Sequence, residues 1–99
     1  MMLQVGDIVE IEPSAEDDCT IEAWKTIQQN PHGVIRALVG NPDKPASLMG
    51  AVEFTAPFAG GIDCNHTCLP RQGQYIMSQN LSLCFEASRE VVTVPTIGG

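Results

Sequence analysis

The chain has 99 residues, 43% of them hydrophobic and 17% charged, and it carries a formal net charge of −7 at pH 7. A chain of this length buries only about 60–65% of its unfolded surface, which allows one small core and excludes a catalytic cleft between domains. The composition is that of a folded protein, and no apolar run reaches the ~18 residues of a membrane span. We therefore treat residues 1–99 as one domain. We expect it to be cytoplasmic, because the N-terminal segment lacks the basic start and apolar stretch of a signal peptide.

The acidic residues are concentrated near the N-terminus. The first 22 residues contain seven Asp or Glu and no Lys or Arg, whereas the five later acids are matched by five basic residues. Such a segment repels phosphate groups, so we expect no direct nucleic-acid binding. Its charge suits a basic protein partner, or an acidic decoy that occupies a nucleic-acid-binding protein. The alternative is a solvated acidic loop that only keeps the protein soluble.

Residues 5–12 predict a strand with one buried face, opened by a Gly-Asp turn. Residues 16–30 are the best helix candidate, because Asp18 or Thr20 can cap the helix and acids in its first turn suit the helix dipole.

The apolar residues of this helix recur every three positions. Ile21, Trp24 and Ile27 are therefore predicted to face the body of the protein. We expect Trp24 to anchor the helix in the core rather than to stack on a ligand.

Strand character returns several times after the helix. The predicted strands are residues 33–39, 51–54, 74–77, 82–85 and 90–94. Residues 56–73 form a long loop without periodicity, and residues 78–81 resemble a single helical turn. Short strands joined by tight turns favour a small closed barrel, because closure removes the exposed strand edges.

The order of the segments GDIVEI, GVIRALVG, AVEF and GQYIMSQNLSLCFE resembles SH3-like small barrels of the KOW and Tudor kind. In those barrels a Gly-Asp opens the first strand, a Gly starts the second, and a one-turn helix precedes the last strand. The resemblance implies a mostly β, five-stranded barrel with one short helix inserted after the first strand. It implies no particular ligand, because the chain lacks a basic KOW surface, a Tudor aromatic cage and the paired Trp of signalling SH3 domains. The chain also resembles the small proteins carried by phages and gene cassettes.

One cluster in the long loop offers metal ligands. Cys64, His66 and Cys68 lie within five residues, and thiolates with an imidazole are typical zinc ligands. The fourth ligand would come from Asp63, Cys84 or His32. The alternatives are a Cys64–Cys68 disulfide, or two reduced cysteines beside a solvated histidine.

The remaining chemistry-bearing residues do not assemble into a catalytic set. Cys84 lies in a predicted strand, where we expect a small buried hydrophobe, and the aspartates before Cys19 should raise its thiol pKa. Glu10 and Glu12 share one strand face, which we expect to be exposed. We identify no group that orients a Cys–His pair and no phosphate-binding Gly loop, so the chain is not predicted to be an enzyme.

The sequence thus predicts a non-catalytic protein-interaction module or accessory subunit. A zinc-stabilised binding domain and the acidic decoy are the alternative hypotheses. The expected partner-binding residues are Glu16, Asp17, Asp18, Glu22, Phe58, Ile62, His66 and Arg71. Phe58 and Ile62 have a second interpretation, in which they fold back to close one barrel end. A homodimer also stays open, because the apolar content is high for so small a chain.

Overall fold

The computed structural model describes residues 3–41 and 43–85. Its strands are β1 (Ile8–Ile11), β2 (His32–Val39), β3 (Met49–Glu53), β4 (Gly73–Met77) and β5 (Leu81–Phe85). Its helices are the 3₁₀ helix η1 (Pro13–Asp18), the α-helix α1 (Ile21–Ile27) and the 3₁₀ turns η2 (Pro45–Ser47) and η3 (Ser78–Asn80). Within the described residues, no helix is long and apolar enough to cross a membrane.

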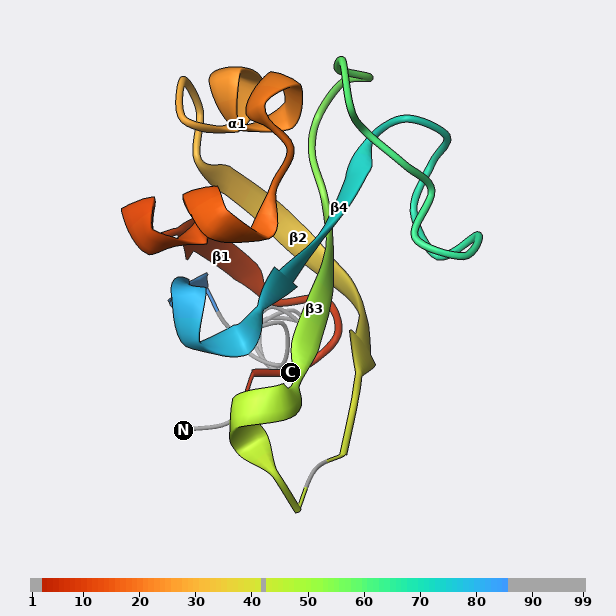
Figure 1. Ribbon diagram of the computed structural model, residues 1–99. Coiled ribbons are helices and arrows are strands. Elements are labelled where there is room, and N and C mark those ends of the chain that lie inside the picture. The colour runs from red at the N-terminus through yellow and green to blue at the C-terminus, as the bar shows by residue number, and fades with distance from the viewer. Residues whose placement is uncertain (1–2, 42, 86–99) are drawn as a thin grey trace, which may run out of the picture.

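The five strands form one antiparallel sheet in the order β4-β3-β2-β1-β5 (Figure 1). The predicted five-stranded, mostly β architecture with a short helix after the first strand is confirmed. The predicted closure into a barrel is not observed, because β4 and β5 are the two sheet edges and no ladder joins them in residues 3–41 and 43–85. The strand expected at residues 90–94 lies outside the described residues.

The first strand has the alternation that the sequence predicts. Val9 and Ile11 are buried while Ile8 and Glu10 are exposed. The turn before the strand requires glycine, because Gly6 has a φ of 96°. The carboxylate of Asp7 then accepts a hydrogen bond from the Gln4 amide at 2.7 Å, which stabilises the turn.

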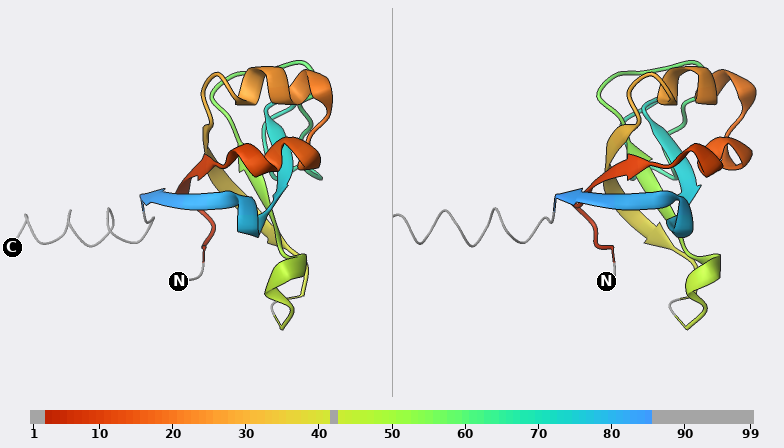
Figure 2. Two further views of the ribbon diagram at one scale, coloured as in Figure 1. Left: turned by 60° about the vertical axis from the view of Figure 1, so that its left-hand side comes forward. Right: turned by 90° about the vertical axis from the view of Figure 1, so that its left-hand side faces the viewer.

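Helix α1 and η1 lie together on one side of strands β2 to β4 (Figures 1 and 2). Thr20 is one of the two residues that were predicted to cap the helix. Its side chain caps α1 by accepting a hydrogen bond from the Ala23 amide at 3.1 Å. The main core cluster fills the space between these elements and the sheet. It contains Val9, Ile11, Ala15, Ala23, Ile27, Ile35, Val52, Phe54, Phe58, Ile76 and Leu81.

The predicted buried face of α1 is partly wrong. The helix buries Ala23 and Ile27, which lie one turn apart, and the half-buried Trp24 packs against the core cluster as expected. Ile21, in contrast, is 80% exposed. The rotation has a steric cause, since Gly60 packs against the helix. A Cβ at Gly60 would lie only 3.1 Å from the Cβ of Ala23, so a small residue on each side permits this approach.

Asp18 connects η1 to the free edge of β4. Its carboxylate accepts hydrogen bonds from the Met77 amide at 3.1 Å and from the Asn80 side-chain amide at 2.8 Å. Its backbone carbonyl accepts a third from the Gln74 side chain at 3.2 Å, and the Asn80 oxygen accepts one from the Ser14 hydroxyl. This network satisfies the Met77 amide at one end of the β4 edge without another strand. At the other end of β4, Gly73 pairs with Ile62 of the long loop between β3 and β4.

We predict that Asp18→Ala lowers the free energy of unfolding by about 2 kcal/mol, because two hydrogen bonds to a carboxylate are lost and Asn80 is left with an unsatisfied amide. The neighbouring Asp17 is exposed, so Asp17→Ala is the matched control and should change stability by less than about 0.5 kcal/mol. Urea unfolding followed by tryptophan fluorescence measures both. Equal losses in the two variants would contradict the network.

Candidate functional site

A groove runs along the exposed side of α1 and η1. It has a volume of about 310 Å³, and its lining is Glu16, Cys19, Ile21, Trp24, Lys25 and Gln28. The two large apolar side chains of this groove, Ile21 and Trp24, are the residues that the sequence analysis assigned to the core. Trp24 does pack against the core cluster, as expected, and its half-buried side chain also lines the groove, whereas Ile21 is exposed against expectation. Together they make this surface partly apolar, where the sequence suggested only charge.

Three of the four predicted acidic binding residues remain available beside this groove. Glu16, Asp17 and Glu22 are exposed, whereas the Asp18 carboxylate is engaged inside the protein by Met77 and Asn80. The sequence could not separate Asp18 from its neighbours, because the distinction depends on β4, which lies almost sixty residues further along the chain.

Cys19 lines the same groove but is not a nucleophile at neutral pH. Burial, followed by the nearby Asp18 carboxylate, raises the pKa of the Cys19 thiol from 9.0 to about 11. The direction agrees with the sequence-based expectation, although the larger cause is burial rather than the acidic neighbours.

The long loop between β3 and β4 is held by its own backbone hydrogen bonds. Ile62 and Gly73 exchange two of them, at 2.9 and 2.6 Å, and the Phe58 amide donates to the Arg71 carbonyl at 3.0 Å. The loop lies at the same end of the molecule as α1, whereas the β2–β3 connection projects from the opposite end (Figures 1 and 2). The predicted long connection at residues 56–73 is thus confirmed to within two residues, because it runs from 54 to 72 and Gly73 already belongs to β4.

The predicted binding residues of the loop divide into two groups. Phe58 is buried in the core, where its ring packs edge-on against Phe54 with centroids 5.4 Å apart, so it is not available to a partner. Ile62, His66 and Arg71 are exposed. Phe58 and Ile62 were each expected either to bind a partner or to fold back onto the core. Phe58 folds back onto the core, whereas Ile62 is exposed.

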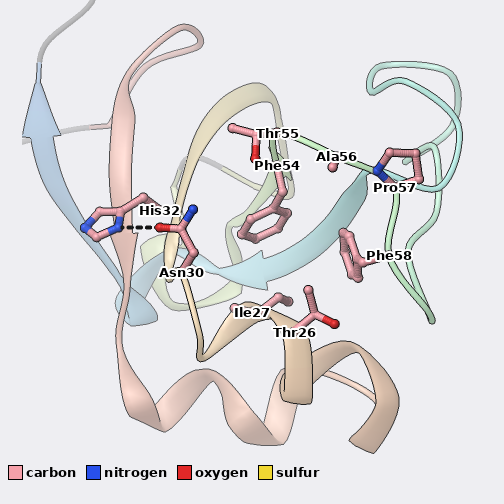
Figure 3. A pocket seen from close by; sticks show the side chains of 9 residues that line it. All are labelled: Thr26, Ile27, Asn30, His32, Phe54, Thr55, Ala56, Pro57 and Phe58. Carbon is pink, nitrogen blue, oxygen red and sulfur yellow. Dashed lines mark hydrogen bonds between the residues drawn. The ribbon is translucent and has the colours of Figure 1, made fainter.

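A small pocket separates the loop from the end of α1 (Figure 3). Its volume is about 90 Å³, and its lining is Thr26, Ile27, Asn30, His32, Phe54, Thr55, Ala56, Pro57 and Phe58. Pockets that enclose small organic ligands usually measure about 300–1,000 Å³, so this one suits a few water molecules rather than a substrate.

Cys64 and Cys68 form a buried thiol pair under the loop. The two thiols are buried together, and the pair packs against Ala51 and Tyr75. Both sulfurs lie against Gly73, since a Cβ there would be 2.8 Å from the Cys68 sulfur and 2.9 Å from the Cys64 sulfur. Burial, followed by the proximity of Cys68, raises the pKa of the Cys64 thiol from 9.0 to about 12, so the pair is structural at neutral pH.

The residues between the two thiols follow a left-handed turn. Cys64, Asn65 and His66 have φ values of 49°, 58° and 69°, and the Thr67 hydroxyl closes the turn on the Cys64 carbonyl at 2.7 Å. The His66 side chain is 88% exposed and its Nδ1 lies 3.1 Å from Asp63, away from the buried sulfurs. This conformation does not gather Cys64, His66 and Cys68 as one ligand set, and a zinc ion at that place stays a prediction.

A different group of metal-ligating side chains comes together on the outer face of the sheet. One ligand atom from each of Glu10, His32 and Cys84 lies within 4.8 Å of the other two. Cys84 is exposed, so the expectation of a buried strand cysteine is wrong, while the expectation of an exposed Glu10 is confirmed. Partial burial, followed by Glu10, raises the pKa of the Cys84 thiol. Sequence reasoning missed the group because it requires the register of three strands.

Comparisons of the chain with protein-family models, with curated proteins and with solved structures find no match. The two surfaces that can indicate a function are therefore the groove beside α1 and the exposed face of the sheet.

We predict that Gly73→Ala destabilises the protein by about 1–3 kcal/mol, because the added methyl group overlaps both thiol side chains. Cys64→Ala removes one of the two sulfurs, so Gly73→Ala should cost less in that background than in the wild type. A double-mutant cycle by urea unfolding measures the coupling. Strictly additive losses would show that the thiol pair does not occupy the space beside residue 73.

The raised thiol pKa also predicts a pH dependence of stability. Above pH 9.0 the unfolded chain ionises Cys64 while the folded protein keeps it protonated, so the free energy of unfolding falls as the pH rises towards 12. The fall should be shallower in Cys64→Ala, measured by urea unfolding at several pH values from 9.0 upward. Identical slopes in variant and wild type would exclude the buried, protonated thiol.

Proposed function

We propose that the protein is a non-catalytic interaction module whose groove beside α1 binds a basic and apolar segment of a partner protein. The observation that carries the proposal is Ile21, which is 80% exposed at the lip of a groove that also contains Trp24. The helix is anchored by Ala23 and Ile27, so the exposure of Ile21 is fixed by the fold and not by fraying.

Burial of Ile21 by a partner is the apolar part of the interaction. A fully buried Ile side chain contributes about 1.5–3 kcal/mol relative to an exposed one. Trp24 is half-buried and supplies a flat, rigid wall, a residue type that is enriched among the strongest contributors to protein interfaces. Together they give the groove an apolar part of its lining.

The charge around the groove indicates the charge of the partner segment. Glu16, Asp17 and Glu22 are exposed near it, and Lys25 is the basic residue of its lining. The excess of negative charge favours Lys or Arg on the partner, and it accelerates association at low ionic strength. A second copy of this chain presents the same acidic surface, so the charge favours a different protein over a homodimer.

We further infer that the sheet is an SH3-like arrangement. Three features support this: β1 lies between β2 and β5, the strands β2 to β4 follow one another as a meander, and η3 separates β4 from β5. The Gly6-Asp7 turn before β1 agrees with the same resemblance. In this arrangement η1 lies where barrel closure would join β4 to β5, and its Asp18 takes the place of a pairing strand.

Random peptides displayed on phage test the proposed function directly. We expect selection on the wild-type protein to enrich peptides that combine Lys or Arg with a large apolar residue. Ile21→Ser should weaken the binding of an enriched peptide at least tenfold, because a buried side chain of this size is lost and about 1.4 kcal/mol corresponds to a factor of ten. Ile62→Ser, at an exposed isoleucine of the long loop, is the matched control and should leave binding unchanged.

The dependence of the peptide affinity on salt separates the electrostatic contribution from the apolar contribution. Glu22→Gln should lower the affinity at low ionic strength and have little effect at high ionic strength. Failure to enrich any such peptide, or equal binding by Ile21→Ser and the wild type, would disprove the groove as the binding site. Loss of binding in Ile62→Ser alone would assign the interaction to the loop instead.

A further inference from the structure

Strands β1, β2 and β5 bring three metal-ligating side chains to one face of the sheet. Glu10 of β1 is the direct register partner of His32 in β2 and of Ser82 in β5. Cys84 lies two residues beyond Ser82 in β5. All three ligand side chains are exposed, and their ligand atoms lie within 4.8 Å of one another.

Cys84 occupies an irregular position in its strand. Phe85 pairs with Ile8 and Leu83 pairs with Val9, which leaves Cys84 as an extra residue opposite neighbouring residues of β1. Such β-bulges are common next to functional sites, because they redirect a side chain without breaking the sheet. Here the bulge places a thiol beside a carboxylate and an imidazole.

The histidine is also oriented for coordination. Nδ1 of His32 lies 3.3 Å from the side-chain oxygen of Asn30, within hydrogen-bond distance. In the tautomer that carries the proton on Nδ1, this nitrogen donates to the Asn30 oxygen and the lone pair is on Nε2. Figure 3 shows this second nitrogen on the side of the ring away from Asn30. A hydrogen bond from the non-ligating nitrogen to an oxygen acceptor is the usual arrangement around metal-bound histidines.

We propose that Glu10, His32 and Cys84 bind a Zn²⁺ ion on the outer face of the sheet. A thiolate, an imidazole and a carboxylate together match the preferences of zinc and not those of Ca²⁺ or Mg²⁺, which select oxygen ligands. Three protein ligands leave one tetrahedral position open to water. This site goes beyond the proposed groove and uses none of its residues.

The distances are compatible with zinc after a small closure. Ligand atoms around a tetrahedral zinc ion lie about 3.5 Å apart, given metal–ligand distances of about 2.0–2.3 Å. The exposed side chains can approach by the remaining distance through rotation alone. Glu12, the nearest other acid on this strand face, already accepts a hydrogen bond from the Ser82 hydroxyl and remains outside the ligand set.

Titration of the reduced, metal-free protein with Co²⁺ tests the site, since cobalt adopts zinc geometry and a cobalt–thiolate bond gives a charge-transfer band. We expect one equivalent to produce that band in the wild type, and Zn²⁺ to displace the cobalt. Cys84→Ser should abolish the band. His32→Gln should weaken the affinity at least about 100-fold. Asn30→Ala should weaken it about tenfold, because it removes only the orienting hydrogen bond.

His66→Gln is the matched control, because His66 is also an exposed histidine and lies beside Cys64 and Cys68 in the chain. Its cobalt spectrum should equal that of the wild type. Absence of a band in the wild type, or its persistence in Cys84→Ser, would overturn the proposal. Loss of the band in His66→Gln would assign the metal to Cys64 and Cys68 instead. Thermal unfolding of each metal-free variant shows that a lost band is not lost folding, and peptide selection in the presence of a chelator keeps the groove's test separate.

Discussion

The free edge of β4 is the constraint on which the arrangement of this small protein depends. An edge strand presents unpaired amides and carbonyls, and most small β proteins satisfy them by closing the sheet or covering its edge. Here the carboxylate of Asp18 binds the Met77 amide, while Asn80 links the same carboxylate to Ser14 of η1. The connection between β1 and β2 is thereby fixed along the gap between β4 and β5. The position of α1, and of everything it exposes, follows from that attachment.

The two candidate functional surfaces lie on different parts of the protein. On one side, α1 uses Ala23 and Ile27 to reach the core, which leaves Ile21 and Trp24 at a groove bordered by acids. On the other, β1 pairs with both β2 and β5, and this double pairing places Glu10 between ligand side chains from two other strands. Neither surface includes the buried thiols of the long loop. Burial raises the pKa of the Cys64 thiol, and both sulfurs pack against Gly73, so these thiols stabilise the fold.

Local patterns were sufficient for the described strands and for α1, and insufficient for η1 and for the face that α1 buries. The alternation through Val9 and Ile11 predicts the first strand, and the Thr20 cap is local, so both could be read from the sequence. The face of α1 could not, because its rotation is set by the approach of Gly60, almost forty residues away. Cys84 resembled a buried strand residue for the same reason, since its exposure depends on a bulge in the pairing with β1. Contacts between residues distant in sequence decide which side chains become functional.

If Asp18 replaces a pairing strand at the edge of β4, its carboxylate protects the Met77 amide from exchange with solvent. Native-state hydrogen exchange of the Met77 amide, followed by NMR, tests this protection most directly, because this proton has the Asp18 carboxylate as its acceptor. We expect it to exchange as slowly as the Ile35 amide, which donates to Asp7 at 2.9 Å in the centre of the sheet. If the Met77 amide exchanges at the rate of an unstructured chain while the Ile35 amide remains protected, Asp18 does not replace a pairing strand. The attachment that positions α1 would then have to be a different one.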